Sequence, residues 1–174
     1  SASVGAPNCG AIRGGVQLGA HPAYVLRNPE RAWATRTTVR RLRAAFDVVH
    51  RRHPRAARVR EHDLSLEGGG PIDDHRSHQS GRDVDITYYQ RRGCDAEDGC
   101  PLSRDEAEAI YVDYALQAPL YREARRRGAS RAQLERWFQY PRGRWHADGV
   151  VRHFPNHRDH LHVRFACEGE ERCR

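Results

Sequence analysis

The chain has 174 residues with 30 basic against 23 acidic side chains, a net charge of +7, and 38% apolar residues. This length and composition fit one folded domain with a hydrophobic core and argue against disorder. No apolar run approaches the roughly 20 residues that a membrane-spanning helix needs, and every basic residue is an arginine, which excludes a phosphate-binding loop built on Gly-Lys-Ser/Thr.

The first half of the chain predicts one long helix. Residues 1–34 are rich in Gly, Pro and Ala without periodicity, and we expect an irregular N-terminal lead-in. From Thr35 to His53, apolar residues recur at helical spacing, which predicts an amphipathic helix. Its arginine-rich face is typical of a solvated surface, and a polyanion is the alternative partner. Residues 58–66 are predicted as a strand.

Two later segments alternate with period 2 and are predicted as strands. In the strand that starts at Asp83, the carboxylates of Asp83 and Asp85 share one face above an apolar underside. In the strand that starts at His160, the imidazoles of His160 and His162 share one face in the same way. Each pair is therefore able to address one small site.

Helices are predicted between these strands. Ser103 and Glu106 form a capping box, which predicts a helix through Tyr114 that falters before Pro119. Two further helical segments are expected, at 120–127 and 133–138. No repeat or second domain is visible, so we expect an α+β fold: one domain over residues 1–174, with a central, mostly antiparallel sheet flanked by helices and long loops.

The five cysteines indicate disulfides rather than a structural metal site. Cys94 and Cys100, and likewise Cys167 and Cys173, each enclose a short polar loop, and neither pair has C-x2-C spacing. Disulfides form in oxidising compartments, and the absence of methionine agrees with removal of a signal peptide. We therefore expect a periplasmic or secreted mature chain. Cys9 is left over, either free or in place of a member of one pair, or joined to a partner outside the chain.

Five of the eleven histidines lie in two clusters, at 75–85 and 157–162. If the two strands are neighbours, imidazoles and carboxylates converge, as a catalytic zinc ion with three N/O ligands and an open position requires. Such an ion lowers the pKa of its bound water to about 7. The clusters predict a metal site, and spacing alone does not choose between Asp83 and Asp85. The alternative is a polar patch of hydrogen-bonded histidines.

The two clusters resemble the penicillin-insensitive murein endopeptidases. The resemblance rests on Ser77-His-Gln-Ser-Gly-Arg-Asp-Val-Asp-Ile86 and on His157-Arg-Asp-His-Leu-His-Val-Arg-Phe-Ala-Cys167. That family belongs to a wider group of zinc peptidases with the lysostaphin-type enzymes, the D-Ala-D-Ala dipeptidases and the hedgehog N-terminal domain. The match covers residues 60–110 and 145–173, and it is loose elsewhere.

The resemblance implies a set of zinc ligands. His78, Asp85 and His162 would hold one zinc ion per chain, with Asp83 in support. It also implies the Cys167–Cys173 disulfide after the His-x-His strand.

The resemblance further implies catalytic roles and a substrate. His160 would act beside the metal-bound water, His157 would assist in proton transfer or oxyanion stabilisation, and His75 would lie at the edge of the site. The implied activity is hydrolysis of D-alanyl–meso-diaminopimelyl cross-links in peptidoglycan by activated water. Neither a nucleic-acid partner nor a membrane span is expected.

Two other functions fit parts of the sequence. A non-catalytic, metal-binding cell-wall module of the same fold is suggested by the hedgehog domain. A basic, metal-dependent nuclease is suggested by the arginines and the histidine pairs.

Overall fold

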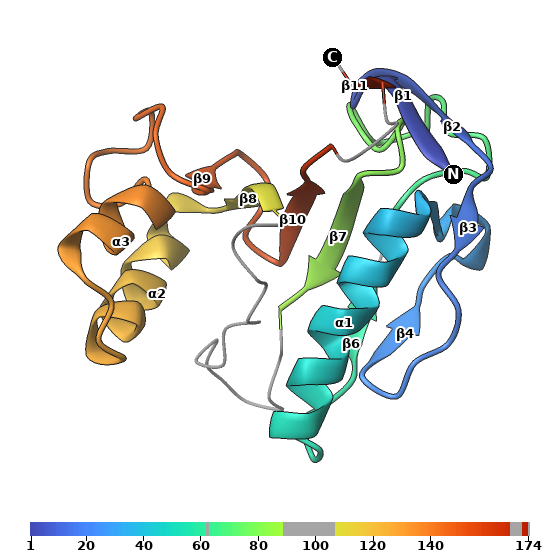
Figure 1. Ribbon diagram of the computed structural model, residues 1–174. Coiled ribbons are helices and arrows are strands. Elements are labelled where there is room, and N and C mark those ends of the chain that lie inside the picture. Colours follow the sequence, from blue (N-terminus) through green and yellow to red (C-terminus); the bar gives the residue numbers. More distant parts are fainter. Residues whose placement is uncertain (62, 89–106, 168–171, 174) are drawn as a thin grey trace.

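The computed structural model of the protein describes residues 1–61, 63–88, 107–167 and 172–173 (Figure 1). Its strands are β1 (Ala2–Ala6), β2 (Cys9–Arg13), β3 (Val16–Gln17), β4 (Tyr24–Leu26), β5 (Trp33–Ala34), β6 (Val59–Glu61), β7 (Asp83–Thr87), β8 (Ala107–Val112), β9 (Val151–His153), β10 (His160–Phe165) and β11 (Arg172–Cys173). Its helices are α1 (Arg36–Arg52), α2 (Tyr114–Arg126), α3 (Arg131–Trp137) and the 3-10 turn η1 (Pro29–Arg31).

A six-stranded sheet in the order β4-β6-β7-β10-β8-β9 forms the centre of the molecule. The three central pairings, β6 with β7, β7 with β10 and β10 with β8, are antiparallel, and the two outer pairings are parallel. The expected α+β fold with a mostly antiparallel sheet is confirmed. Figure 1 shows α1 lying along one side of the sheet, with α2 and α3 at the opposite end beside β8 and β9.

Helix α1 forms where the sequence predicted it. The side chain of Thr35 caps its N-terminus by accepting a hydrogen bond from the backbone N–H of Thr38. Leu42 and Phe46 are buried in the main core, which also contains Val84 of β7 and Val163 of β10. The apolar stripe therefore holds α1 against the face of the sheet that does not carry the carboxylates.

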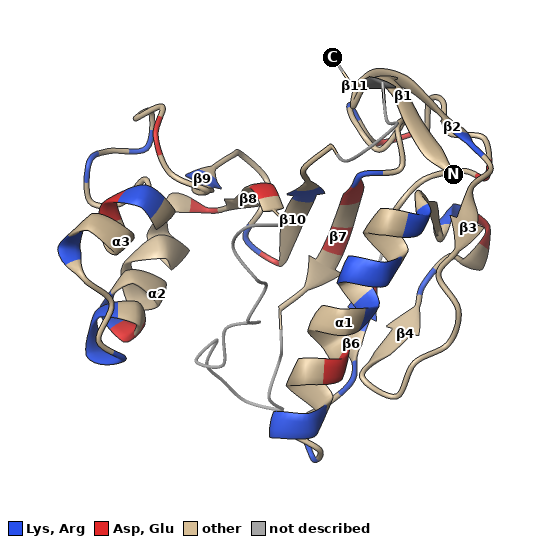
Figure 2. Ribbon diagram, viewed as in Figure 1, with Lys and Arg blue, Asp and Glu red and all other residues tan. Residues whose placement is uncertain are grey.

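The arginines of α1, blue along the ribbon in Figure 2, are mostly exposed according to their accessible surface. Arg41 is the exception, because it is buried and its Nη1 donates to the backbone oxygen of Ala166 at 3.1 Å. One basic side chain of this helix thus ties α1 to the residue after β10.

The N-terminal segment was predicted wrongly as irregular. Residues 1–34 contain β1 to β5, and β1 pairs with β2 in a hairpin and with β11 in parallel. Strands of two to five residues carry too little periodicity to be recognised. Their pairing with distant residues, not their own pattern, fixes them.

The helix predicted from Ser103 is wrong over residues 107–112, although Tyr114 is helical as the first residue of α2. Ser103 and Glu106 lie outside the described residues, and residues 107–112 form β8. This strand pairs with β10 on one edge and with β9 on the other, so two rows of backbone hydrogen bonds outweigh helix propensity.

Helix α2 then continues through Pro119 instead of ending before it. Gln117 holds the first half of the helix, because its buried side chain accepts a hydrogen bond from the backbone N–H of Tyr140 at 3.0 Å. The helical segment expected at 133–138 is present as α3, with Ser130 and Gln133 forming a capping box.

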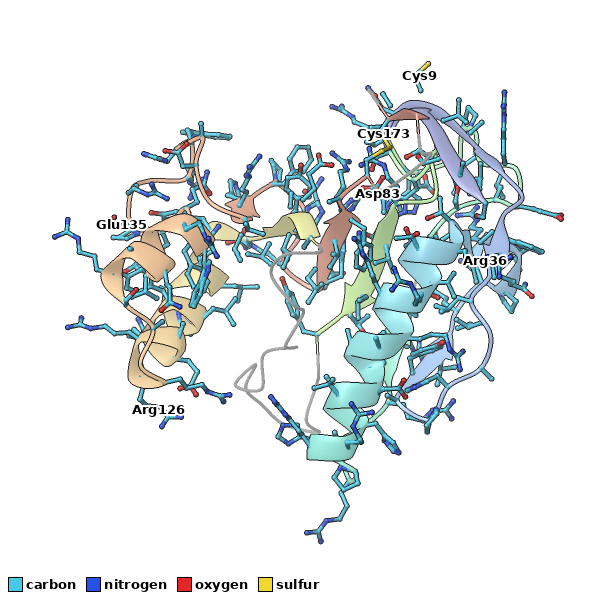
Figure 3. The ribbon with its side chains drawn as sticks, viewed as in Figure 1. Cys9, Arg36, Asp83, Arg126, Glu135 and Cys173 are labelled. Carbon is cyan, nitrogen blue, oxygen red and sulfur yellow. A yellow bond between two sulfur atoms is a disulfide. The ribbon has the colours of Figure 1, made fainter. Side chains whose placement is uncertain are left out.

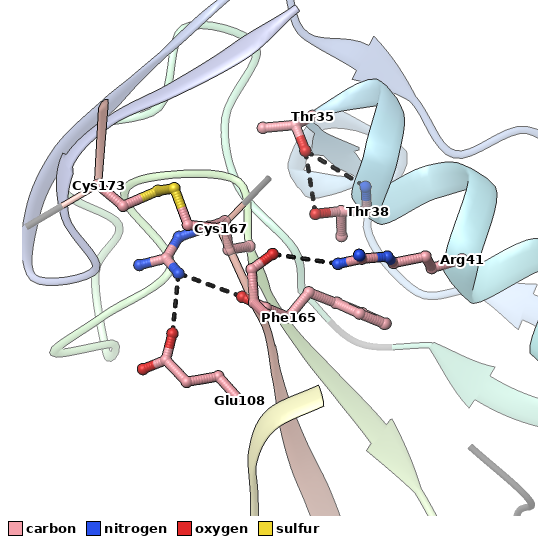
Figure 4. The surroundings of a disulfide bond; sticks show 9 residues. Thr35, Thr38, Arg41, Glu108, Phe165, Cys167 and Cys173 are labelled. Atoms are coloured by element: carbon pink, nitrogen blue, oxygen red, sulfur yellow. Dashed lines mark hydrogen bonds and ion pairs between the residues drawn. A yellow bond between two sulfur atoms is a disulfide. The ribbon is translucent and has the colours of Figure 1, made fainter. Parts of the chain in front are cut away.

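The predicted Cys167–Cys173 disulfide is present (Figure 4). It joins the chain after β10 to β11. The buried Arg82 donates through Nη1 to the backbone oxygen of Phe165 at 3.2 Å, two residues before Cys167, and contacts Glu108 at 3.0 Å. Cys9 is an exposed free thiol, and Cys94 and Cys100 lie outside the described residues. Among the helices that are described, we find none with the length and apolar character to cross a membrane.

Candidate functional site

The two polar strands are neighbours in the sheet, as the metal hypothesis required. In the antiparallel register of β7 and β10, His162 lies opposite Asp85 and Arg164 lies opposite Asp83. Figure 3 labels Asp83 on β7, next to β10. Side chains that are opposite each other in such a pair have Cβ atoms about 5 Å apart. The register alone therefore brings an imidazole and a carboxylate into contact.

His78 enters this cluster from the loop before β7. Its side chain is buried, and its Nδ1 lies 2.8 Å from the backbone oxygen of Leu64, to which it donates. Its Nε2 is buried without a hydrogen-bond partner among the described residues and lies 3.4 Å from Oδ2 of Asp85. A buried nitrogen that faces a carboxylate without a hydrogen bond is costly, and a cation between the two groups would satisfy both.

Asp85 is at the centre of the cluster. Oδ1 lies 3.0 Å from Nδ1 of His162, and Oδ2 lies 3.6 Å from Nδ1 of His75 and 3.9 Å from Nε2 of His160. Burial alone would raise the pKa of this carboxyl group, but the close imidazoles of His162 and His78 hold the pKa well below its ordinary range. Asp85 is therefore an anion surrounded by imidazoles.

The far side of His162 is held by Asp83. Nε2 of His162 lies 2.7 Å from Oδ1 of Asp83, which also accepts a hydrogen bond from Nε of Arg164 at 2.8 Å. Burial opposes charge on both partners, yet their contact dominates: the pKa of His162 rises to about 9 and that of Asp83 falls to about 2. The ring is thus fixed with Nδ1 facing Asp85.

His75 is held in the same manner by Asp63. Nε2 of His75 lies 2.8 Å from Oδ2 of Asp63, whose carboxylate also accepts hydrogen bonds from Asn28 and Arg31. Burial would raise the pKa of Asp63, but these hydrogen bonds lower it below its ordinary value. Nδ1 of His75 is therefore the nitrogen that faces Asp85.

The arrangement fits a divalent cation. One donor atom each from His75, His78 and Asp85 lie within 4.8 Å of one another. His162 lies outside that set, although its Nδ1 is 3.0 Å from Asp85. A carboxylate or a backbone carbonyl behind each imidazole is the arrangement that fixes ring orientation in metal sites.

His157 and His160 lie on the open side of the cluster. Their ring centroids are 4.7 Å apart. Nδ1 of His160 lies 2.8 Å from Oδ1 of Asp159, and Nδ1 of His157 lies 2.8 Å from the backbone oxygen of Pro155. Burial lowers the pKa of His157 below its ordinary value. Nε2 of His160, at 3.9 Å from Oδ2 of Asp85, is the nitrogen that faces the cluster.

Sequence reasoning missed three residues of this site. Asp63 and Asp159 each hold a histidine, and the ring of Tyr111 lies 5.4 Å from that of His162. Tyr111 was missed because its segment was predicted as a helix. The alternation of apolar and charged residues at Ala107, Glu108 and Ala109 is the sequence signal that favours a strand. The contact between Asp63 and its histidine crosses 12 residues of loop and leaves no local signal.

Comparison with known proteins adds one finding. The sequence model of the family described as penicillin-insensitive murein endopeptidase matches residues 3–134. The matched part includes His75, His78 and Asp85 and ends before the histidines of β10 and the loop that precedes it. A search of curated proteins finds no match.

Proposed function

Because the chain belongs to the penicillin-insensitive murein endopeptidase family, and is therefore a peptidase that acts on murein, we propose that it is a zinc-dependent enzyme. In this proposal His78, Asp85 and His162 hold the ion, with His75 as a fourth donor. The bond cleaved is the D-alanyl–meso-diaminopimelyl cross-link.

One observation supports the metal most strongly. Nε2 of His78 is a buried nitrogen without a hydrogen-bond partner among the described residues, and it faces the Oδ2 atom of Asp85 at 3.4 Å. If these two side chains had only a structural role, we would expect this buried nitrogen to have a hydrogen-bond partner. Three imidazoles and one carboxylate form a nitrogen- and oxygen-rich set, which suits zinc.

The ion would supply a water of lowered pKa and polarise the scissile carbonyl. The chain's own residues provide orientation and proton transfer. His160 is fixed through Nδ1 by Asp159, so its Nε2 is directed towards Asp85, at 3.9 Å. At that position Nε2 is suited to receive a proton as the amide is attacked and to deliver it to the leaving amine.

His157 is suited to a different task from His160. Its pKa is lowered by burial, so its ring is neutral near pH 7 and its Nδ1 donates to the backbone oxygen of Pro155. A neutral imidazole close to the site is able to accept a proton or to orient the substrate. No side chain is required to attack the substrate covalently, so β-lactams, which acylate serine nucleophiles, should not inhibit the reaction.

The decisive experiment is digestion of purified cross-linked sacculi followed by mass spectrometry of the muropeptides, with and without a chelator. We expect the cross-linked dimers to decrease, the chelator to stop this, and zinc to restore it. Asp85→Ala should lose both zinc and activity, whereas His160→Ala should lose activity and keep most of the zinc.

His53→Ala is the matched control, because His53 is an exposed histidine at the end of α1. This variant should retain activity and zinc. Full hydrolysis of the sacculi by Asp85→Ala would contradict the assignment of Asp85 as a zinc ligand. Binding to sacculi without any released product would instead support the non-catalytic module.

A further inference from the structure

A hollow of about 630 Å³ opens beside the catalytic histidines, a volume typical of small-molecule sites. Three connections build it: the turn from β8 to α2, the loop from α3 to β9, and the loop from β9 to β10. The lining residues that matter below are Asp113, Arg144, Trp145, His153, Arg158 and Asp159.

The hollow borders the proposed active site. Asp159 lines it and contacts Nδ1 of His160 at 2.8 Å. Pro155 also lines it and accepts the hydrogen bond of His157 through its backbone oxygen. A molecule in the hollow is therefore one side chain away from the groups that would exchange protons with the substrate.

Trp145 gives the hollow an apolar surface. The residue is 77% exposed, although tryptophan is on average highly buried in folded proteins. Its ring stands edge to face with that of His153, with 5.7 Å between the centroids. Nδ1 of His153 accepts a hydrogen bond from the backbone N–H of Tyr114 at 3.1 Å, which fixes the ring. An indole exposed on a fixed support is suited to stack on a flat, weakly polar ring.

The charges around Trp145 balance. The lining contains two arginines and two aspartates, and Nε of Arg158 lies 3.3 Å from Oδ2 of Asp113. The formal charges of these four side chains cancel, so they do not select an anion. Its guanidinium and carboxylate groups nevertheless present paired donors and acceptors, which suit hydroxyl and amide groups. An apolar platform bordered by such groups matches the two faces of a sugar ring.

We propose that this hollow binds an N-acetylated sugar of the murein glycan strand, with the sugar face stacked on Trp145. The proposal rests on the proposed function, because it assigns the position of the glycan next to the cleaved peptide. The sugar anchors the cross-link so that the peptide bond reaches His160 and the metal cluster. The enzyme should therefore distinguish cross-links that carry sugars from those that do not.

The test compares two substrates: a cross-linked muropeptide dimer that carries its disaccharides, and the same dimer after an amidase has removed them. We expect wild-type kcat/KM to be higher for the sugar-bearing dimer. Trp145→Ala should reduce the ratio of the two kcat/KM values by about three- to tenfold, mainly through KM, and Trp145→Phe should restore most of it. A ratio that Trp145→Ala leaves unchanged would overturn the proposal. If kcat/KM falls equally for both dimers, the hollow binds the peptide instead.

A binding measurement separates this proposal from the function on which it rests. Peptide-free glycan fragments of alternating N-acetylglucosamine and N-acetylmuramic acid are added while tryptophan fluorescence is followed. We expect a saturable change in the wild type that Trp145→Ala abolishes. If neither dimer is cleaved but the fragments still bind, the glycan site stands and the endopeptidase assignment fails. If the fragments leave the fluorescence unchanged, the glycan site is wrong whether or not the dimers are cleaved.

Discussion

Nε2 of His162 lies 2.7 Å from Oδ1 of Asp83, between residues 79 positions apart in the chain. This hydrogen bond orients the ring so that the other nitrogen, Nδ1, faces Asp85 at 3.0 Å. Asp83 is fully buried and also holds Arg164. Asp83 is therefore a positioning residue: it fixes the orientation of the His162 ring so that Nδ1 points into the metal cluster.

Replacing Asp83 by asparagine should weaken zinc binding. The amide removes the negative charge that contacts Nε2 of His162. Loss of such a partner lowers metal affinity by about 10- to 100-fold. The measurement is competition for zinc against a chromogenic chelator. Asp159→Asn is the matched control: it removes a carboxylate from His160, so it should lower kcat and leave zinc affinity near that of the wild type. Equal zinc affinities for Asp83→Asn and the wild type would contradict this role.

His75→Ala should reduce zinc affinity less than Asp85→Ala does. His75 offers Nδ1 to the cluster 3.6 Å from Oδ2 of Asp85 and is held by Asp63, but three other ligands remain when it is removed. The zinc content after dialysis against graded chelator concentrations ranks the variants. An affinity for His75→Ala that equals that of His160→Ala would place His75 outside the ligand set.

Glu61 should make the free energy of unfolding depend on pH. It is fully buried, and neither carboxyl oxygen has a hydrogen-bond partner among the described residues. Burial, reinforced by the charges of Asp63 and Asp85, raises its pKa from 4.5 to about 9. The folded protein keeps this proton while the unfolded chain loses it above pH 4.5. The contribution of Glu61 to stability is therefore complete below that pH and is lost as the pH rises towards 9, by at most about 1.4 kcal/mol per unit.

Glu61→Gln mimics the protonated side chain and should remove this slope. Urea unfolding at pH 5 and pH 8, with a chelator present throughout, measures it. The variant should gain stability relative to the wild type as the pH rises from 5 to 8. If the variant and the wild type show the same change with pH, Glu61 is already ionised in the folded protein.

Gly81→Ala should destabilise the fold and loosen the site. Gly81 has φ +69°, and an added Cβ would lie 2.6 Å from Cδ1 of Ile12 and 3.0 Å from the backbone nitrogen of Thr35. Steric crowding of this kind typically costs about 1–3 kcal/mol, in addition to the strain of a positive φ. Because Gly81 lies between His78 and Asp85 in the chain, we also expect weaker zinc binding.

Gly128→Ala separates strain from crowding. Gly128 also has a positive φ, +89°, but an added Cβ meets nothing within 4 Å. Chemical denaturation should show a smaller decrease in the free energy of unfolding for Gly128→Ala, about 1–2 kcal/mol, and zinc affinity should be unchanged. Equal losses for the two variants would show that the contact with Ile12 does not matter.

The histidine clusters and the alternation of β7 and β10 were predictable from sequence, because period-2 patterning is local to a strand. The pairing of Asp63 with His75 was not, because it depends on a loop that folds back between them. Residues 107–112 were predicted wrongly as helix because the sequence shows only the local cap signal. The backbone hydrogen bonds to β10 and β9, which make this segment a strand, involve residues distant in the chain.

By itself, the sequence determined which chemical groups are available and which of them share a strand face, since both follow from residue type and spacing. Only the tertiary structure decided how they combine. The antiparallel register that places His162 opposite Asp85, the carboxylates behind His75 and His162, and the hollow around Trp145 all join segments distant in the chain. Such contacts depend on how backbone pairing and core burial are satisfied together over the whole molecule, and no local pattern specifies them.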